Sequence, residues 1–299
     1  MLMDNKNLVF LILILIIVGI LALILYYGFF NSQGEEGNQF TAPTYSNKTS
    51  PSNTVKLIFI HHSTGENWLS DENGRLGMTL RDNNYFVSDT NYGWGPEAIG
   101  DKTDIGYWWL WFRGPDSARY LSALYSENGQ NCQYSRLSNN PGGENEIIIF
   151  KSCFPNSALQ GNPNDPIPSI GSNPLKGESA ESEVHTVANA KGIYIDLLKY
   201  FKTRPDKLFI VVTAPPLSDP TYAGNARSFN YWLVNDWLKD YPYNNVAVFD
   251  FYSVLTNGGN TLAYPSSWGD DHPSKEGNLK ATREFINFLN NAYYQWKSE

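Results

Sequence analysis

The apolar residues of this chain form one long run near the N-terminus and several short runs farther on. The long run spans residues 8–30 and holds 23 residues without a charge. At about 1.5 Å of rise per residue it predicts a helix of roughly 34 Å, enough to cross a hydrocarbon core of about 30 Å. The short runs hold four to six residues and alternate with segments of helical periodicity.

The long run predicts an uncleaved signal anchor. A cleavable signal peptide has a shorter apolar region of about 7–15 residues followed by a small-x-small site, and residues 31–36 offer no such site. Lys6 precedes the run and two glutamates follow it, which favours a cytoplasmic N-terminus of residues 1–7. We therefore expect a single-pass membrane protein whose remaining chain lies outside the cytoplasm, with a cleaved signal peptide as the alternative.

Residues 31–54 are rich in Asn, Ser, Thr, Gly and Pro and poor in aliphatic residues. This composition predicts a flexible linker with a root-mean-square span of about 27 Å. It includes the sequon Asn47-Lys48-Thr49, which fits an exposed segment outside the cytoplasm.

The rest of the chain, residues 55–299, predicts one α/β domain. Runs rich in β-branched and aromatic residues predict buried strands at residues 55–60, 85–88, 146–151, 208–213 and 246–251. Helical periodicity predicts helices at residues 75–81, 117–126, 182–202, 226–239 and 274–296. Apolar strands separated by helices indicate a mainly parallel sheet covered on both faces, in a three-layer α/β/α arrangement.

Composition excludes several classes of protein. The net charge of −8 and the absence of a basic run make nucleic acid a poor partner. Aromatic residues reach 15% and apolar residues 41%, too many for a disordered chain. Two cysteines are too few for a disulfide scaffold or a cysteine-based zinc module.

The first predicted strand is followed by the segment His61-His62-Ser63-Thr64-Gly65. A serine on the turn between a strand and a helix is exposed, and the helix N-terminus offers backbone N–H groups to a developing oxyanion. The spacing approaches the G-x-S-x-G nucleophile elbow, with His61 in place of the first glycine. Ser63 is therefore a candidate nucleophile, and the alternative is a serine that caps a helix.

Two later segments carry the groups that a nucleophilic serine needs. His272 follows Asp270 and Asp271 just before the last predicted helix, where an imidazole can act as base and a carboxylate can orient it. The alternative is an acidic cluster at the helix N-terminus. Asn156 follows the strand at 146–151, and its amide could donate to an oxyanion or simply belong to a turn.

In this order and these places, the segments resemble the blocks of the SGNH (GDSL-type) hydrolases. The resemblance rests on FIHHSTGEN, VSDTNYG, KSCFPNS and DDHPSKEG and covers most of residues 55–299. It implies Ser63 as nucleophile, His272 as base, and an oxyanion hole formed by the backbone N–H groups of Ser63 and Gly93 with the side chain of Asn156. It also implies a flavodoxin-like sandwich that performs ester hydrolysis or acyl transfer without a cofactor.

The chain departs from the family pattern in two places. His61-His62-Ser63 stands where Gly-Asp-Ser is usual, and Gly269 stands where the aspartate of Asp-x-x-His is usual. The acid is therefore Asp270, in an Asp-x-His arrangement like that of some polysaccharide O-acetyltransferases of the superfamily, or Asp271. We favour Asp270 because alternate spacing brings its carboxylate nearer the other face of the imidazole.

The sequence also allows chemistries other than a serine triad. The three histidines and two aspartates of these segments could ligate a divalent cation, but no recognised ligand spacing is present. We therefore expect no metal and no cofactor. Cys153 could act as a thiol nucleophile, although such thiols beside a buried strand are more often inert. A disulfide between Cys132 and Cys153 suits the expected compartment and is left open.

The aromatic segments at 91–94 and 107–111 suggest the substrate. Aromatic faces stack on sugar rings, so we predict an esterase that deacetylates a surface or extracellular carbohydrate, with His62 and Trp94 in contact with the substrate. The same residues could instead be core, and lipid or aryl esters remain open. The alternative functions are an O-acyltransferase and a glycan-binding domain without turnover. The natural acyl group and the oligomeric state stay open.

Overall fold

This computed structural model describes residue 19 and residues 43–298. The predicted membrane span and the first part of the predicted linker lie outside the described residues. Within the described residues, no helix combines the length and the apolar character that crossing a bilayer requires. The described chain from residue 43 onward belongs to one compact unit.

The centre of this unit is a parallel sheet of five strands in the order β2-β1-β3-β4-β5. This is the strand order of flavodoxin-like sheets, in which the direction of winding reverses between β1 and β3 and ligands bind at the carboxyl ends of the strands. The strands are β1 (Val55–Ile60), β2 (Tyr85–Thr90), β3 (Ile147–Lys151), β4 (Leu208–Val212) and β5 (Val246–Phe249).

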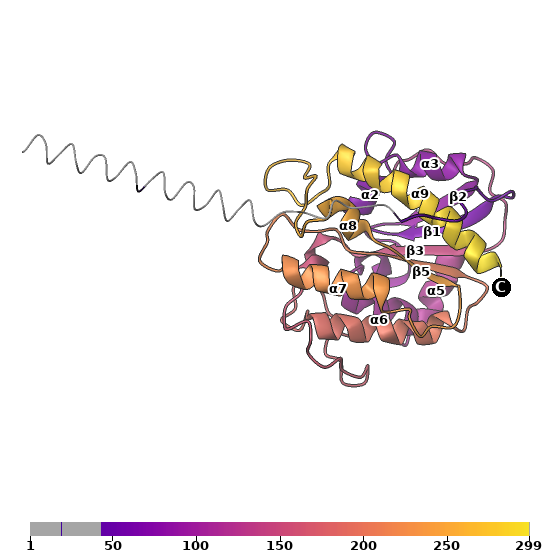
Figure 1. Ribbon diagram of the computed structural model, residues 1–299. Coiled ribbons are helices and arrows are strands. Elements are labelled where there is room, and N and C mark those ends of the chain that lie inside the picture. The colour runs from indigo at the N-terminus through magenta and orange to yellow at the C-terminus, as the bar shows by residue number, and fades with distance from the viewer. Residues whose placement is uncertain (1–18, 20–42, 299) are drawn as a thin grey trace, which may run out of the picture. The chain divides into compact units, whose positions relative to one another are not determined.

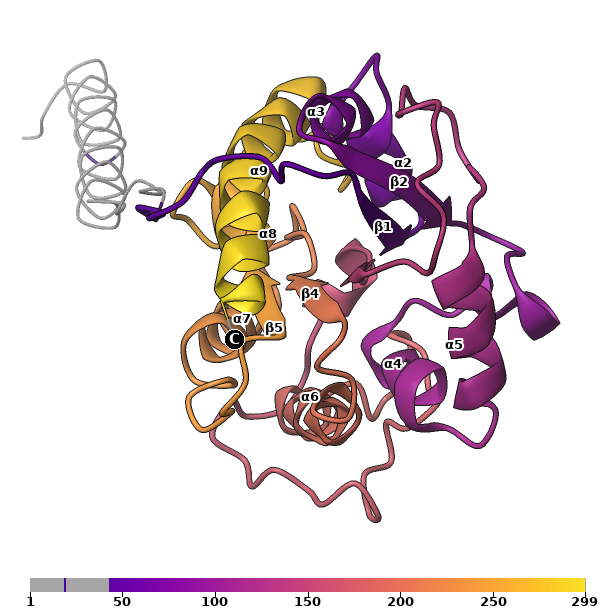
Figure 2. The same cartoon turned by 90° about the vertical axis from the view of Figure 1, so that its right-hand side faces the viewer.

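Helices flank the sheet on both faces, which confirms the predicted α/β class (Figures 1 and 2). One face is covered by α2 (Ser63–Leu69), α3 (Leu76–Asp82), α8 (Phe251–Thr256) and α9 (Lys275–Lys297). The other face is covered by α4 (Ile105–Arg113), α5 (Ser117–Ser126), α6 (Val187–Phe201) and α7 (Ala223–Asn235). Two short 3₁₀ helices are η1 (Pro96–Asp101) and η2 (Phe154–Ser157).

Aromatic side chains fill the core on both sides of the sheet. Trp108 of α4 packs edge-on against Phe150 of β3 at a centroid distance of 5.0 Å. On the opposite face, Trp68 of α2 contacts Phe285 of α9 at 5.1 Å and donates its indole N–H to Thr282. Each such ring removes a large apolar area from water, so most of the aromatic residues serve to fill the core.

At two of the element boundaries that differ from the predicted ones, polar side chains cap helices. The strand predicted at 246–251 ends at Phe249, since Asp250 accepts the backbone N–H of Ser253 and begins α8. The helix predicted at 182–202 begins at Val187, where the hydroxyl of Thr186 caps the first turn. Sequence periodicity does not register caps of this kind.

Part of the predicted linker packs along α9. The amide of Asn290 donates to the carbonyl of Lys48 at 2.9 Å, and Asn291 accepts from the hydroxyl of Ser46 at 3.0 Å. The hydroxyl of Tyr294 donates to the carbonyl of Ser50 at 3.1 Å. In the described part of the chain, the compact unit therefore begins before residue 55.

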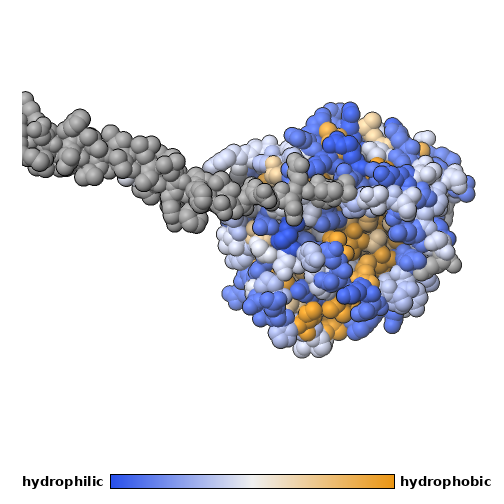
Figure 3. Space-filling view, viewed as in Figure 1, coloured by the Kyte–Doolittle hydropathy of each residue, from blue (hydrophilic) through white to orange (hydrophobic). Residues whose placement is uncertain are grey.

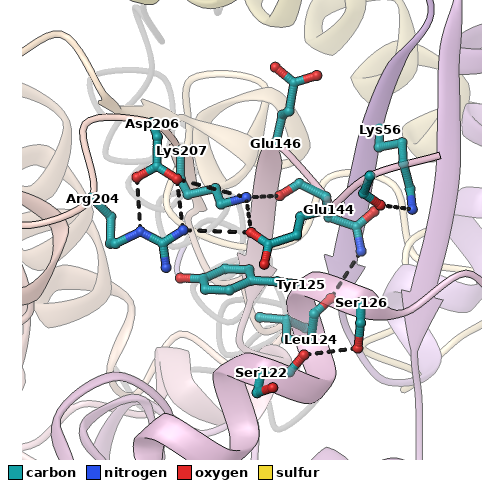
Figure 4. Close-up of polar contacts among 12 residues, drawn as sticks. Lys56, Ser122, Leu124, Tyr125, Ser126, Glu144, Glu146, Arg204, Asp206 and Lys207 are labelled. Atoms are coloured by element: carbon teal, nitrogen blue, oxygen red, sulfur yellow. Dashed lines mark hydrogen bonds and ion pairs between the residues drawn. The ribbon is translucent and has the colours of Figure 1, made fainter. Parts of the chain in front are cut away.

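Charged groups cover the amino ends of the central strands (Figure 4). The nearly buried ammonium of Lys207 donates to the carbonyl of Asn145 at 2.9 Å and to Glu144 at 2.8 Å. Arg204 and Lys207 lie over the ring of Tyr125, 4.6 and 4.8 Å from its centroid. The amino ends of the strands are occupied by structural contacts, whereas the candidate site described below lies at their carboxyl ends.

On the side of the molecule drawn in Figure 3, apolar residues gather in two places. Figure 3 shows that apolar residues on this side gather over β5 and over α6, among otherwise hydrophilic residues. Ala247 and Val248 of β5 are only partly buried, because β5 is an edge strand with one hydrogen-bonded neighbour.

Candidate active site

Ser63 and His272 come together at the carboxyl end of β1. Ser63 is the first residue of α2, and His272 lies in the loop before α9. Although the two residues are 209 positions apart, Ser63 Oγ lies 2.9 Å from His272 Nε2. Both side chains are half-buried, so the pair is held by the protein and remains open to solvent.

Asp270 lies on the other side of the same imidazole. Its Oδ1 atom is 2.7 Å from His272 Nδ1 and also accepts the backbone N–H of His272 at 2.9 Å. The hydroxyl of Ser266 donates to the second carboxylate oxygen. Hydrogen bonds from Ser266 and then from His272 hold the pKa of Asp270 well below its usual range, so this carboxylate is ionised and only accepts hydrogen bonds.

The partners of the imidazole determine its tautomer. Because the carboxylate of Asp270 is an acceptor, Nδ1 of His272 carries the hydrogen. Nε2 then presents its lone pair to the hydroxyl of Ser63, which donates to it. A serine hydroxyl, a neutral imidazole and a carboxylate in this order are what general-base activation of a serine requires.

The second aspartate of the segment has a different partner. Asp271 Oδ1 accepts the backbone N–H of Ser218 at 2.7 Å, which ties the loop before α9 to the segment that follows β4. The structure thus brings Asp270, and not Asp271, onto the ring of His272.

A tight turn presents Ser63 at the start of α2. The carbonyl of His62 accepts the N–H groups of Gly65 and Glu66 at 2.8 and 3.0 Å, which closes the first helical turn. A Cβ atom at Gly65 would lie 2.3 Å from Cβ of His61, so only glycine fits this turn. The hydroxyl of Ser63 is thereby left to bond His272 rather than to cap the helix.

A buried lysine supports the turn that carries Ser63. Lys151 is fully buried at the end of β3, and its ammonium donates to Thr64 Oγ1 at 2.6 Å. Cys153 Sγ lies 3.0 Å from the same oxygen. Burial lowers the pKa of Lys151, while the adjacent Cys153 raises it. Cys153 is occupied in this structural contact and lies outside the chain of hydrogen bonds around His272.

Two of the expected oxyanion donors already have acceptors. The backbone N–H of Gly93 donates to Asp101 Oδ1 at 2.7 Å. The amide of Asn156 is buried and donates to Asp104 Oδ1 at 2.7 Å and to the carbonyl of Cys153 at 3.3 Å. The expectation that these two groups are free to receive an oxyanion is therefore not met in this structure, because nearby aspartates occupy them.

Tyr92 lies beside Ser63, whose backbone N–H is the remaining donor. Its ring stacks on His62 at a centroid distance of 3.9 Å. Burial raises the pKa of Tyr92 and the contacts with Ser63 lower it. The side chain is 61% exposed. Sequence reasoning noticed only that Tyr92 belongs to an aromatic cluster and assigned it no role.

The two residues expected to contact substrate lie inside the protein. His62 is buried, with Nε2 bonded to the carbonyl of Gly100 at 2.7 Å and Nδ1 to Thr103 at 3.1 Å, and burial lowers its pKa. Trp94 is 8% exposed and stacks on Trp111 at 5.8 Å. Trp94 is thus a core residue here rather than a platform for a sugar ring, because its indole packs inward from the loop.

The histidines and aspartates considered as metal ligands do not form one cluster. Within residues 43–298, the group with the composition and spacing of a cation site is His61, Asp89 and Cys132. Cys132 and Cys153 are both free thiols. Burial and the carboxylate of Asp89 raise the pKa of Cys132, so this thiol is not activated as a nucleophile.

No protein-family model matches the chain, and no curated protein matches it significantly. The chain is similar to a solved family two carbohydrate esterase from Clostridium thermocellum in complex with cellohexaose, at 13% identity and a TM-score of 0.40, over 88% of this chain and 69% of that one. It is also similar to a family two carbohydrate esterase from Cellvibrio japonicus, at 12% identity and a TM-score of 0.39, over 86% of this chain and 64% of that one. At these values the likeness carries no argument about chemistry.

Proposed function

We propose that this protein is a serine esterase in which Ser63 is the nucleophile, His272 the general base and Asp270 the orienting acid. The observation that carries the proposal is the continuous chain of hydrogen bonds from Ser63 through His272 to Asp270, at 2.9 and 2.7 Å. Residues far apart in sequence meet here in the order and polarity of a catalytic triad, at the edge of the sheet where α/β proteins bind ligands.

The reaction follows from this polarity. The hydroxyl of Ser63 attacks the ester carbonyl and transfers its proton to Nε2 of His272, and the ionised Asp270 stabilises the imidazolium. His272 then gives the proton to the departing alcohol, which leaves an acyl-serine. A water molecule, deprotonated by His272, attacks the acyl group and releases the acid and free Ser63.

The developing oxyanion needs hydrogen-bond donors. The N–H of Ser63 is the nearest one, and the phenol of Tyr92 lies close to it. A substrate carbonyl would displace this phenol, whose ring is largely exposed. Gly93 and Asn156 would add their donors only by exchanging Asp101 and Asp104 for the substrate. Each donor aimed at an oxyanion is worth roughly 10²–10³ in rate.

We propose an acetylated carbohydrate as the substrate. Trp268, which is 101% exposed, lies four residues before His272, and Tyr92 is 61% exposed beside Ser63. Large aromatic rings kept in water, one beside Ser63 and one in the segment before His272, offer flat faces on which sugar rings can stack. Trp94, Trp108 and Trp111 are core residues, so Trp268 and Tyr92 are the rings that support the proposal of a carbohydrate.

We also propose that residues 8–30 anchor the protein in a membrane with the esterase unit outside the cytoplasm. The support is the length of the uncharged apolar run and the lysine that precedes it. The expected result is recovery of the full-length chain in the membrane fraction, resistant to alkaline carbonate, with residues 43–298 open to added protease in spheroplasts. Recovery of processed chain in the medium would overturn the anchor.

The esterase proposal is tested by hydrolysis of p-nitrophenyl acetate and of acetylated oligosaccharides by the full-length protein. We expect turnover that falls about 10⁴-fold or more in Ser63→Ala and is unchanged in Ser70→Ala, a serine at the other end of α2. Turnover that appears only with an added sugar acceptor would assign acyl transfer instead. Folded wild-type protein without turnover on either ester, or equal activity in Ser63→Ala, would overturn the proposal.

A further inference from the structure

A second polar cluster lies beneath the turn that carries Ser63. His61 Nε2 is 3.2 Å from Asp89 Oδ2 and 3.9 Å from Cys132 Sγ, and the three atoms all lie within 4.8 Å of one another. His61 follows β1, Asp89 lies in β2, and Cys132 belongs to the long segment between α5 and β3. His61 and Asp89 are fully buried. None of the three takes part in the proposed ester hydrolysis.

The outer partners of the cluster leave its inner atoms as acceptors. His61 Nδ1 lies 2.9 Å from the carbonyl of His62, so this nitrogen carries the hydrogen and donates it. Asp89 Oδ1 accepts the hydroxyl of Tyr134 and the backbone N–H of Asn131, each at 2.8 Å. Nε2 of His61 and Oδ2 of Asp89 therefore face each other with lone pairs, beside the sulfur of Cys132.

We propose that His61, Asp89 and Cys132 bind a divalent zinc ion. Zinc bound to nitrogen, oxygen and sulfur at about 2.0–2.3 Å in a tetrahedron separates its ligand atoms by roughly 3.3–3.6 Å, close to the 3.2 and 3.9 Å found here. A metal-bound imidazole typically donates its other N–H to a carbonyl, and a ligating carboxylate is itself hydrogen-bonded. Both conditions hold here.

The fourth position and the entry path lie on the side of Cys132. A cavity of about 690 Å³ opens at this residue and is lined also by Tyr134, Ser135 and Asp71. Cys132 is half-buried, so its sulfur is the ligand that an ion from solvent meets first. Water from this cavity completes the tetrahedron.

The site would brace the nucleophile turn. His61 is two residues before Ser63, and its ring bonds the same carbonyl of His62 that begins α2. Zinc would join the ends of β1 and β2 to the segment that holds Cys132, at a place where His61 also packs against Gly65. The ion acts on the stability of the turn, and the ester chemistry stays with Ser63.

The test is zinc content of the untagged full-length protein after chelator treatment, incubation with zinc chloride and desalting. We expect about one zinc per chain by elemental mass spectrometry, and a higher melting temperature with zinc than without. Cys132→Ser should lose both effects, because serine is a poor zinc ligand. Cys153→Ser is the matched control and should keep them, since Cys153 lies outside the cluster.

Cobalt provides a second readout that does not depend on activity. Cobalt(II) bound at the site should give the charge-transfer absorption of a cobalt–thiolate bond, present in wild type and Cys153→Ser and absent in Cys132→Ser. The alternative for the cluster is a direct hydrogen bond between His61 and Asp89 without a metal ion. Zinc far below one per chain in folded wild type, or zinc retained equally by Cys132→Ser, would overturn the proposal in favour of that hydrogen bond.

Discussion

Asp270 Oδ1 accepts two hydrogen bonds from His272, one from the ring and one from the backbone N–H, at 2.7 and 2.9 Å. The two residues are separated by a single position. The backbone contact folds the Asp-x-His segment into a turn that returns the carboxylate to the ring of its own neighbour. The shortened spacing therefore still supplies an acid to the base.

Replacement of Asp270 tests this relationship. In Asp270→Asn the amide no longer favours the hydrogen on Nδ1 or stabilises the imidazolium, and we expect kcat/KM for p-nitrophenyl acetate to fall about 10²- to 10⁴-fold. The side chain of Asp270 is 37% exposed, and solvent screening favours the lower part of that range.

Asp271→Asn is the matched control for this substitution. Its carboxylate bonds the backbone of Ser218 and not the imidazole, so we expect kcat/KM within about threefold of wild type. A larger loss in Asp271→Asn than in Asp270→Asn would contradict the assignment of the acid.

Ser266 should make stability depend on pH. Its hydrogen bond is the main cause of the low pKa of Asp270, and a carboxylate whose folded pKa is depressed stabilises the fold above the unfolded value of about 4. This contribution is lost as pH falls through the folded pKa. Ser266→Ala should melt below wild type at pH 7, and the difference should begin to narrow below about pH 4 and continue to narrow as the pH falls further. Ser267→Ala, at the exposed neighbour, is the control and should show no pH-dependent difference in melting temperature from wild type. A difference between Ser266→Ala and wild type that does not change with pH would contradict this cause.

We propose that the hydroxyl of Tyr92, which lies beside Ser63, competes with substrate for the N–H of Ser63. Tyr92→Phe removes this hydroxyl and keeps the stack on His62. We expect kcat/KM for p-nitrophenyl acetate to rise about 2- to 10-fold, the equivalent of one neutral hydrogen bond. Tyr243→Phe, at the amino edge of the sheet, should have no effect. A fall in kcat for Tyr92→Phe would show instead that the phenol donates to the oxyanion.

Trp268 should matter for sugars and not for small esters. Because the indole is fully exposed, Trp268→Ala should leave the melting temperature unchanged. Loss of one stacking face should raise KM for acetylated oligosaccharides about 3- to 10-fold, in line with about 0.5–1.5 kcal/mol for an aromatic contact. The KM for p-nitrophenyl acetate should not change. Equal effects on both esters, or an effect as large in Tyr243→Ala, would count against a carbohydrate substrate.

Lys207 should contribute to stability at the opposite edge of the sheet. Lys207→Met leaves the carbonyl of Asn145 without its ammonium partner, so we expect a loss of about 1–3 kcal/mol in the free energy of unfolding. Lys199→Met, on the surface of α6, should cost less than about 1 kcal/mol because its partner Asp196 keeps a bond to Arg113. Chemical denaturation of both variants measures the difference, and equal losses would contradict it.

The strands were the most predictable part of the fold. The strand predicted at 55–60 matches β1 to the residue, because six consecutive apolar or aliphatic-stemmed residues buried on both faces leave no other register. The helices were predicted less well. The aromatic segment at 107–111 was left without an assigned element, yet it lies in α4 with Trp108 and Trp111 in the core. Its continuous apolar character hides the helical period.

The candidate site could likewise be predicted only in part. Ser63 could be found from the sequence because it follows β1 at the carboxyl end of the strand, and His272 because it stands next to two aspartates just before α9. The partners of Gly93 and Asn156 could not, since Asp101 at the end of η1 and Asp104 just before α4 reach them through tertiary contacts that no periodicity shows. The cluster around His61 also escaped sequence reasoning, because its three members come from separate segments and only packing brings them together.

The proposed esterase mechanism requires that Ser63 forms a covalent bond with substrate. The most direct measurement is reaction of the full-length protein with a fluorophosphonate, followed by peptide mass spectrometry and assay of the remaining esterase activity. We expect one adduct, on Ser63, that forms in proportion to the loss of esterase activity. Labelling of Ser63 should be strongly reduced in His272→Ala. Complete inactivation with Ser63 unmodified, or full activity with Ser63 modified, would contradict the mechanism.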